Sequence, residues 1–190
     1  ELIIPIIEKI LRENISELNE ISLVALPSVN CDNREKLTLG NPWYLRRNAN
    51  GVDLNRNFPA EWIVVDSVYN YFTSDPDGLT YRGPFPGSES ETMATMRFLK
   101  KFRPKAVFSF HHLAGICGET LLVSRTAKND KKYIDLCNQY AKLFWEGIDP
   151  QLVENRQVSP GCSPGSLATW CYLELGIPAY DIEGPVNKDD

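Results

Sequence analysis

The sequence is poor in histidine and cysteine, and both shortages exclude kinds of site. Among 190 residues there are two histidines, His111 and His112, which are adjacent. Because neighbouring side chains of a strand point to opposite faces, the two cannot serve one site without a bend. The five cysteines are widely spaced and form no CxxC pair. This pattern argues against a disulfide framework or a cysteine zinc site, and it favours a reducing compartment such as the cytoplasm.

The sequence also lacks long runs of one chemical character. No basic run accompanies the net charge of -5, so nothing favours a nucleic acid as the partner. No apolar stretch approaches the roughly 20 residues that a membrane span needs. Internal repeats, low-complexity tracts and linkers are missing as well. A chain of 190 residues without linkers is expected to form a single domain with a substantial core.

Apolar periodicity predicts an α/β fold. Helical spacing marks four segments, residues 2–13, 89–102, 128–146 and 167–175. Short apolar runs predict buried strands at residues 21–27, 106–111, 119–124 and 177–182. Ser88 and Glu91 have the spacing of a capping box at the start of the second helix. Nearly all-apolar strands that alternate with helices indicate a mixed, mostly parallel central sheet with helices on both faces.

Residues 46–59 form the most unusual segment, with three arginines and four asparagines around Asp53. Asparagine and glycine favour turns, so this run is a poor strand and a poor helix. Guanidinium groups beside amide groups can hold a carboxylate through two parallel hydrogen bonds. The segment therefore indicates a carboxylate-binding loop, with a polar surface loop as the alternative.

Two further candidates stand at the ends of predicted strands. His111 ends the second predicted strand, at the edge where α/β folds bind ligands, and histidine is a common metal ligand and general base. Glu183 follows the last predicted strand, where a carboxylate can act as a general base. For each residue, a purely structural role at the strand end is the alternative. Combined with Arg46, Asn55 and Arg56, these two residues favour a metal-dependent exopeptidase.

Four segments in order resemble the zinc metallocarboxypeptidases, and the resemblance covers almost the whole chain. The segments are residues 50–59 (NGVDLNRNFP), 81–92 (YRGPFPGSESET), 109–111 (SFH) and 165–183, which begins with GSL and ends in a glutamate. The resemblance implies a phosphorylase/hydrolase-like carboxypeptidase fold, zinc as the cofactor, and a peptide with a free carboxylate as the substrate. The first segment looks closest to bacterial branches that cleave cell-wall peptides, so a murein-peptide hydrolase is one interpretation.

The resemblance also implies the catalytic roles. His111 would be a zinc ligand, and Glu183 would be the general base that takes a proton from a metal-activated water. Arg46 would polarise the scissile carbonyl and stabilise the oxyanion, with its neighbour Arg47 as the alternative. Asp53 would fix the ring of a zinc-binding histidine.

Substrate binding is assigned in the same way. By the resemblance, Asn55 and Arg56 would hold the terminal carboxylate, and Ser166 and Leu167 would line the substrate site. An apolar residue at position 167 argues mildly against a preference for C-terminal lysine or arginine. Residues 158–164 lack the tyrosine with which many members cover the substrate, which leaves the side-chain preference open.

The sequence departs from the family in its metal ligands. The family binds zinc through His-x-x-Glu and a later histidine, but the chain has no His-x-x-Glu. Glu1 stands near the place of that glutamate, so we expect a catalytic domain that is truncated at both ends. Two other functions stay open, a related zinc deacylase of N-acyl amino acids and a metal-free peptide-binding pseudoenzyme.

Overall fold

The central sheet of the protein consists of two parallel strand pairs that are joined by one antiparallel pairing. The structure is a computed structural model that describes residues 3–13, 16, 19–40, 45–68, 70–111, 120–148 and 156–183. Its strands are β1 (Ser67–Val68), β2 (Tyr71–Phe72), β3 (Val107–His111), β4 (Thr120–Ser124), β5 (Ser159–Cys162) and β6 (Ala179–Glu183). The order in the sheet is β3-β6-β4-β5. β3 with β6 and β4 with β5 are parallel pairs, whereas β4 and β6 are antiparallel, so the predicted mixed, mostly parallel sheet is confirmed.

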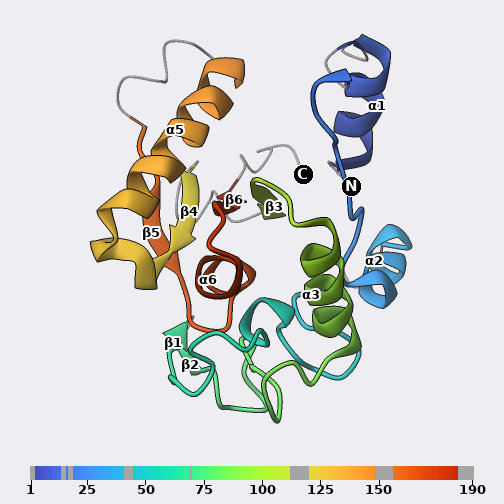
Figure 1. Ribbon diagram of the computed structural model, residues 1–190. Coiled ribbons are helices and arrows are strands. Elements are labelled where there is room, and N and C mark those ends of the chain that lie inside the picture. Colours follow the sequence, from blue (N-terminus) through green and yellow to red (C-terminus); the bar gives the residue numbers. More distant parts are fainter. Residues whose placement is uncertain are drawn as a thin grey trace.

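Helices cover both faces of this sheet, as predicted (Figure 1). The helices are α1 (Ile3–Glu13), α2 (Cys31–Thr38), α3 (Ser90–Phe102), α5 (Lys131–Ile148) and α6 (Leu167–Trp170), with short helical turns η2 (Leu54–Arg56), η3 (Arg125–Asn129) and η5 (Cys171–Leu175). None of the helices in the described ranges is long and apolar enough to cross a membrane.

The two faces of the sheet bury separate apolar clusters. On one face α5 packs against β4 and β6, and this cluster includes Tyr133, Cys137, Trp145, Leu121, Tyr180 and Ile182. On the other face α3, α6 and η5 form a second cluster, which includes Met96, Leu99, Trp170, Cys171, Phe58 and Ala179. Because side chains alternate along a strand, the polar members of β6 lie on the side of the second cluster.

Most of the predicted elements are confirmed. The four predicted helices correspond to α1, α3, α5 and the joined pair α6 and η5, and Gly176 ends the last of them with φ +65°. Three predicted strands correspond to β3, β4 and β6. β5 was not predicted, since the sequence Ser-Pro-Gly-Cys carries no apolar run.

The prediction of a buried strand at Ile21–Pro27 is wrong. These residues form no strand, and Ile21, Leu23 and Val24 are exposed. An apolar run becomes a strand only when a neighbouring strand completes its hydrogen bonds, and within the described ranges this segment has none.

The predicted capping box is also wrong. α3 begins at Ser90, and its N-cap residue Glu89 makes no capping hydrogen bond through its side chain. Ser88 donates instead to Glu89 Oε1 at 2.6 Å, and Glu91 Oε1 accepts from Asn48 at 3.0 Å. Side chains with capping chemistry are used here for tertiary contacts.

Gly165 is the point where the loop before α6 meets the segment after Arg56. Its amide donates to Ala60 O at 2.8 Å, and its carbonyl accepts from Phe58 N at 2.9 Å. Its φ is +74°, and an added Cβ would overlap the carbonyl group of Arg56. Only glycine fits this close approach without a shift of the backbone.

We therefore expect Gly165→Ala to lower the free energy of unfolding by about 2–4 kcal/mol, because alanine is strained in a left-handed backbone and its Cβ would overlap the carbonyl group of Arg56. The control is Gly147→Ala in α5, where an added Cβ meets no atom within 4 Å. This variant should gain about 0.5–1 kcal/mol, because alanine favours a helix over glycine. Urea unfolding measures both changes, and an unchanged midpoint for Gly165→Ala would contradict the assigned role.

Candidate active site

The register between β3 and β6 brings the candidate catalytic residues together. His111 is the cross-strand partner of Glu183, and Ser109 is the partner of Asp181. Glu183 and Asp181 are 5% and 4% exposed, so two carboxylates lie buried beside the histidine. Parallel pairing thus places the predicted base and the predicted metal ligand at the same carboxyl edge of the sheet.

Asp181 joins His111 to the asparagine-rich segment. One carboxylate oxygen, Oδ2, accepts from Asn55 Nδ2 at 2.9 Å and from Cys162 Sγ at 3.5 Å. The other oxygen, Oδ1, lies 3.4 Å from His111 Nε2 and has no hydrogen bond of good geometry in the described structure. The side chain of His111 is 23% exposed, so one part of its ring remains open to solvent.

The buried charges shift the pKa values of this pair in opposite directions. Burial raises the pKa of Asp181, but the charge and hydrogen bond of His111, followed by the contributions of Asn55 and Arg56, outweigh burial and hold this pKa below its ordinary value. Burial lowers the pKa of His111, but the neighbouring carboxylates, chiefly Asp181, outweigh burial and raise it. Both shifts favour the charged partners over neutral ones.

Asn55 and Arg56 lie beside the start of α6. Asn55 Oδ1 accepts from the amide of Leu167 at 2.9 Å, and Ser166 caps α6 by accepting from Thr169 N at 3.2 Å. Arg56 is 7% exposed, and its Nη1 atom donates to the carbonyl of Asn55 at 2.6 Å. Its buried Nε has no hydrogen-bond partner in the part of the chain that the structure describes. The four predicted substrate-binding residues therefore lie in one place.

Arg46 and Arg47, the two candidates for one catalytic role, have different partners. The Nε and Nη2 atoms of Arg46 both lie 2.8 Å from Oδ2 of Asp53. Asp53 Oδ1 accepts in turn from the amide of Asn55 at 3.1 Å, so Arg46 is connected to the segment that holds Asn55 and Arg56. Arg47 donates to the carbonyls of Pro76 and Gly78 and holds that turn. The predicted role of Asp53 at a histidine ring stays a prediction.

A buried glutamate anchors the asparagine-rich segment to α3. Glu89 is 3% exposed, and its Oε2 accepts from Asn48 at 2.7 Å and from Asn50 at 2.8 Å. Burial raises the pKa of Glu89, but the hydrogen bonds from Ser88, Asn48 and Asn50 outweigh burial and lower the pKa below its ordinary value. The loop is thus held by a charged group rather than by a strand or a helix.

His111 is the one predicted zinc ligand among the residues that the structure describes. His111 offers an imidazole with a buried carboxylate behind Nε2, an arrangement typical of zinc-binding histidines. Catalytic zinc usually has three protein ligands, and in the described ranges no group of three His, Cys, Asp or Glu side chains could hold a metal. The predicted ligand Glu1, like His112, lies outside the described residues.

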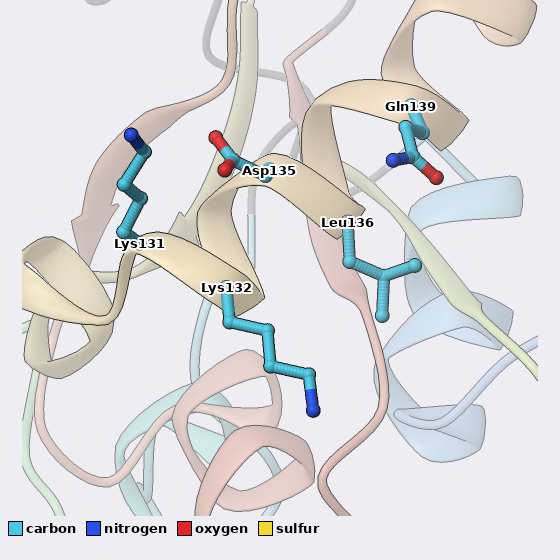
Figure 2. Close-up of a pocket in the computed structure, with 5 residues that line it drawn as sticks. All are labelled: Lys131, Lys132, Asp135, Leu136 and Gln139. Atoms are coloured by element: carbon cyan, nitrogen blue, oxygen red, sulfur yellow. The ribbon is translucent and has the colours of Figure 1, made fainter.

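Of two hollows on the protein surface, one lies away from the candidate residues and the other is lined partly by them. One hollow of about 550 Å³ is lined by Lys131, Lys132, Asp135, Leu136 and Gln139, all from α5 (Figure 2). It contains none of the candidate residues, and its lining from a single helix does not make a site. A second hollow of about 350 Å³ has Arg46, Arg47 and Asn48 in its wall.

Two functional candidates, Asp181 and Glu89, were not predicted. Asp181 did carry a signal, because it interrupts an apolar strand two residues before Glu183 and therefore faces the same side of the sheet. Glu89 carried no comparable signal. Its partners lie 41 and 39 residues away along the chain, and it was interpreted as part of a helix start.

Comparison with known proteins assigns the chain to a family. Residues 2–189 match the family model described as zinc carboxypeptidase. The chain is 44% identical over 164 residues to murein peptide amidase A of Escherichia coli K12, covering 84% of the chain and 58% of that protein. The chain thus spans less than two thirds of this relative's length.

Solved structures support the fold. Bovine thrombin-activatable fibrinolysis inhibitor gives a TM-score of 0.63 at 24% identity, covering 85% of this chain and 57% of that one. Carboxypeptidase A from Helicoverpa armigera gives a TM-score of 0.63 at 18% identity, covering 87% of this chain and 42% of that one. The predicted carboxypeptidase fold is therefore confirmed.

The lowered pKa of Glu89 predicts a pH-dependent cost for Glu89→Gln. Wild-type Glu89 contributes stability above the ordinary glutamate pKa, and this stability is lost as the pH falls through the lower pKa of the folded protein. At neutral pH the variant should lose about 1.5–3 kcal/mol of unfolding free energy, because the charged acceptor is gone.

Urea unfolding at neutral pH and at a pH below about 4, where an ordinary glutamate becomes protonated, tests this expectation. The cost of Glu89→Gln should shrink on acidification. Glu174→Gln, which removes the same charge at an exposed position of η5, is the control and should change stability little at either pH. A cost for Glu89→Gln that is equal at both pH values would contradict the role of the carboxylate charge.

Proposed function

The chain belongs to the zinc carboxypeptidase family, and we propose that it acts in a zinc-dependent carboxypeptidase that hydrolyses the C-terminal amide bond of a peptide. One observation carries the proposal. The β3–β6 register places His111 beside Glu183, Asp181 contacts both His111 and Asn55, and the Asn55 carbonyl accepts from Arg56. The residues that we propose as base, metal ligand and carboxylate-binding arginine are thereby connected at one edge of the sheet.

The proposed reaction assigns a proton path to Glu183. Bound zinc would supply a Lewis acid for the scissile carbonyl and would make the attacking water more acidic. Glu183 would take a proton from that water as it attacks and then give it to the leaving amine, so the carboxylate is regenerated. Arg46, held against Asp53, would donate to the oxygen that becomes negative.

Substrate orientation would depend on Asn55 and Arg56. The guanidinium of Arg56 is buried with an unpartnered Nε in the described structure, so it has hydrogen-bonding capacity for an incoming carboxylate. The similarity to a murein peptide amidase supports a cell-wall peptide as the substrate. Rates toward peptides with free and amidated C-termini, and toward murein peptides, would test this choice.

Glu183→Gln in the full-length protein should reduce kcat by about 10²–10⁴-fold, because the amide cannot accept the proton. Zinc content, measured by atomic emission, should stay at the wild-type level. Glu174→Gln provides the matched control and should retain activity. A near-normal rate for Glu183→Gln would refute the base assignment.

Arg56→Ala should raise KM for peptides with a free carboxyl terminus by about 10–100-fold, because a charged hydrogen-bonded pair is lost. Arg56→Lys keeps the charge but not the planar fork, so its KM should lie between those of the wild type and Arg56→Ala. Arg125→Ala, which removes an exposed arginine paired with Asp66, is the control. Equal KM values of the wild-type protein for free and amidated peptides would exclude the role of Arg56.

A further inference from the structure

We propose that a basic hollow beside Arg46 binds a carboxylate that the substrate carries in addition to its terminal one. The inference rests on the proposed function and deepens it, because it makes an acidic peptide the preferred substrate. The hollow has a volume of about 350 Å³, and its polar wall consists of Asn33, Lys36, Arg46, Arg47 and Asn48. The described residues that line it do not include Asn55 or Arg56, so it is distinct from the proposed site of the terminal carboxylate.

The hollow carries positive charge that no carboxylate balances. Lys36, Arg46 and Arg47 are cations, and none of the described residues that line the hollow is acidic. Asp53 neutralises Arg46. Arg47 donates to two backbone carbonyls, which are uncharged, and neither Arg47 nor Lys36 forms an ion pair within the described structure. A carboxylate of a ligand would supply the missing negative charge and would accept hydrogen bonds from these donors.

Hydrogen bonds hold the walls of the hollow in place. The carbonyl of Arg47 accepts from Asn33 of α2 and, at 3.2 Å, from Asn30 at the start of that helix, so α2 is attached to the arginine segment. Asn48 is 5% exposed and donates to Glu89 at 2.7 Å. A site whose backbone is already fixed loses less conformational entropy when a ligand binds, which favours binding.

The proposed path of the peptide leads to this hollow. In the proposed function, Arg56 holds the terminal carboxylate and Arg46 faces the scissile carbonyl. Arg46 also lines the hollow, so a peptide that runs from Arg56 past Arg46 would enter it with the residue that precedes the scissile bond. The methylene groups of an acidic side chain would contact Leu45 and Leu79 in the apolar part of the wall, and its carboxylate would lie near Lys36.

Binding of two small probes to the full-length protein tests the hollow without any turnover. N-acetylglutamate amide has its side-chain carboxylate as its only charge, and N-acetylglutamine amide is its neutral counterpart. In two-dimensional NMR, the charged probe should shift the backbone amide signals of Lys36 and of Gly51, which also lines the hollow, about 5-fold more than the neutral probe does at equal concentration. Equal shifts for the two probes, or shifts confined to other parts of the protein, would overturn the inference.

Lys36→Glu tests whether the hollow serves the proposed reaction. Two peptides that differ only in glutamate or glutamine before the scissile bond give a ratio of kcat/KM values, and the wild-type protein should favour the glutamate peptide about 5–10-fold. Lys36→Glu should lower this ratio about 5-fold, because one attraction is lost and one repulsion is added. Lys132→Glu makes the same charge reversal at an exposed lysine of the other hollow (Figure 2) and should keep the wild-type ratio.

The two experiments separate this inference from the proposed function. Equal kcat/KM values of the wild-type protein for the two peptides, or an unchanged ratio in Lys36→Glu, would overturn the preference for acidic peptides and leave the peptidase proposal in place. A full-length protein that distinguishes the two probes but hydrolyses no peptide would overturn the proposed function, and with it the assignment of the bound carboxylate to a substrate.

Discussion

The parallel, in-register pairing of β3 with β6 is the constraint on which the site depends. It sets His111 against Glu183 and Ser109 against Asp181 at the same time. A slip of one residue would turn these side chains to the opposite face of the sheet, toward α5 and its apolar cluster. The apolar residues that alternate with them, such as Tyr180 and Ile182, are buried there and oppose any such slip. Core packing and site geometry are therefore determined by one register.

Buried polar contacts fix the conformation of the segment around Asn48, which helices and strands do elsewhere in the molecule. The segment around Asn48 has no strand partner and only the short turn η2, yet Asn48 and Asp53 are almost fully buried. Glu89 on one side and Asp181 on the other bind its asparagine side chains. Because an unpaired buried polar group costs free energy, each of these contacts favours a single loop conformation. The residues that we propose to bind the substrate carboxylate, Asn55 and Arg56, are positioned by that conformation.

Sequence patterns predicted what depends on local periodicity and on motifs. The amphipathic helices and three strands follow from spacing, and the common edge of His111 and Glu183 follows from their positions at the ends of two predicted strands. The strand at Ile21–Pro27 was predicted wrongly because pairing depends on a partner that an apolar run does not reveal. Glu89 was misread because capping residues and tertiary anchors share the same chemistry. Long-range partners of polar side chains leave little trace in a single sequence.

The residues of the candidate site come from segments that are distant along the chain. Glu183 pairs with His111 across the strands, Asp181 accepts from Asn55, and the Asn55 carbonyl accepts from Arg56. His111 is the one predicted metal ligand within the described ranges, which contain no group of three side chains that could hold a metal. Asp181 contacts both His111 and Asn55, so it connects the strand edge to the asparagine-rich segment. A change that moves Asp181 would therefore disturb both neighbours, whereas a change at Arg56 would leave the contact between Asp181 and His111 in place.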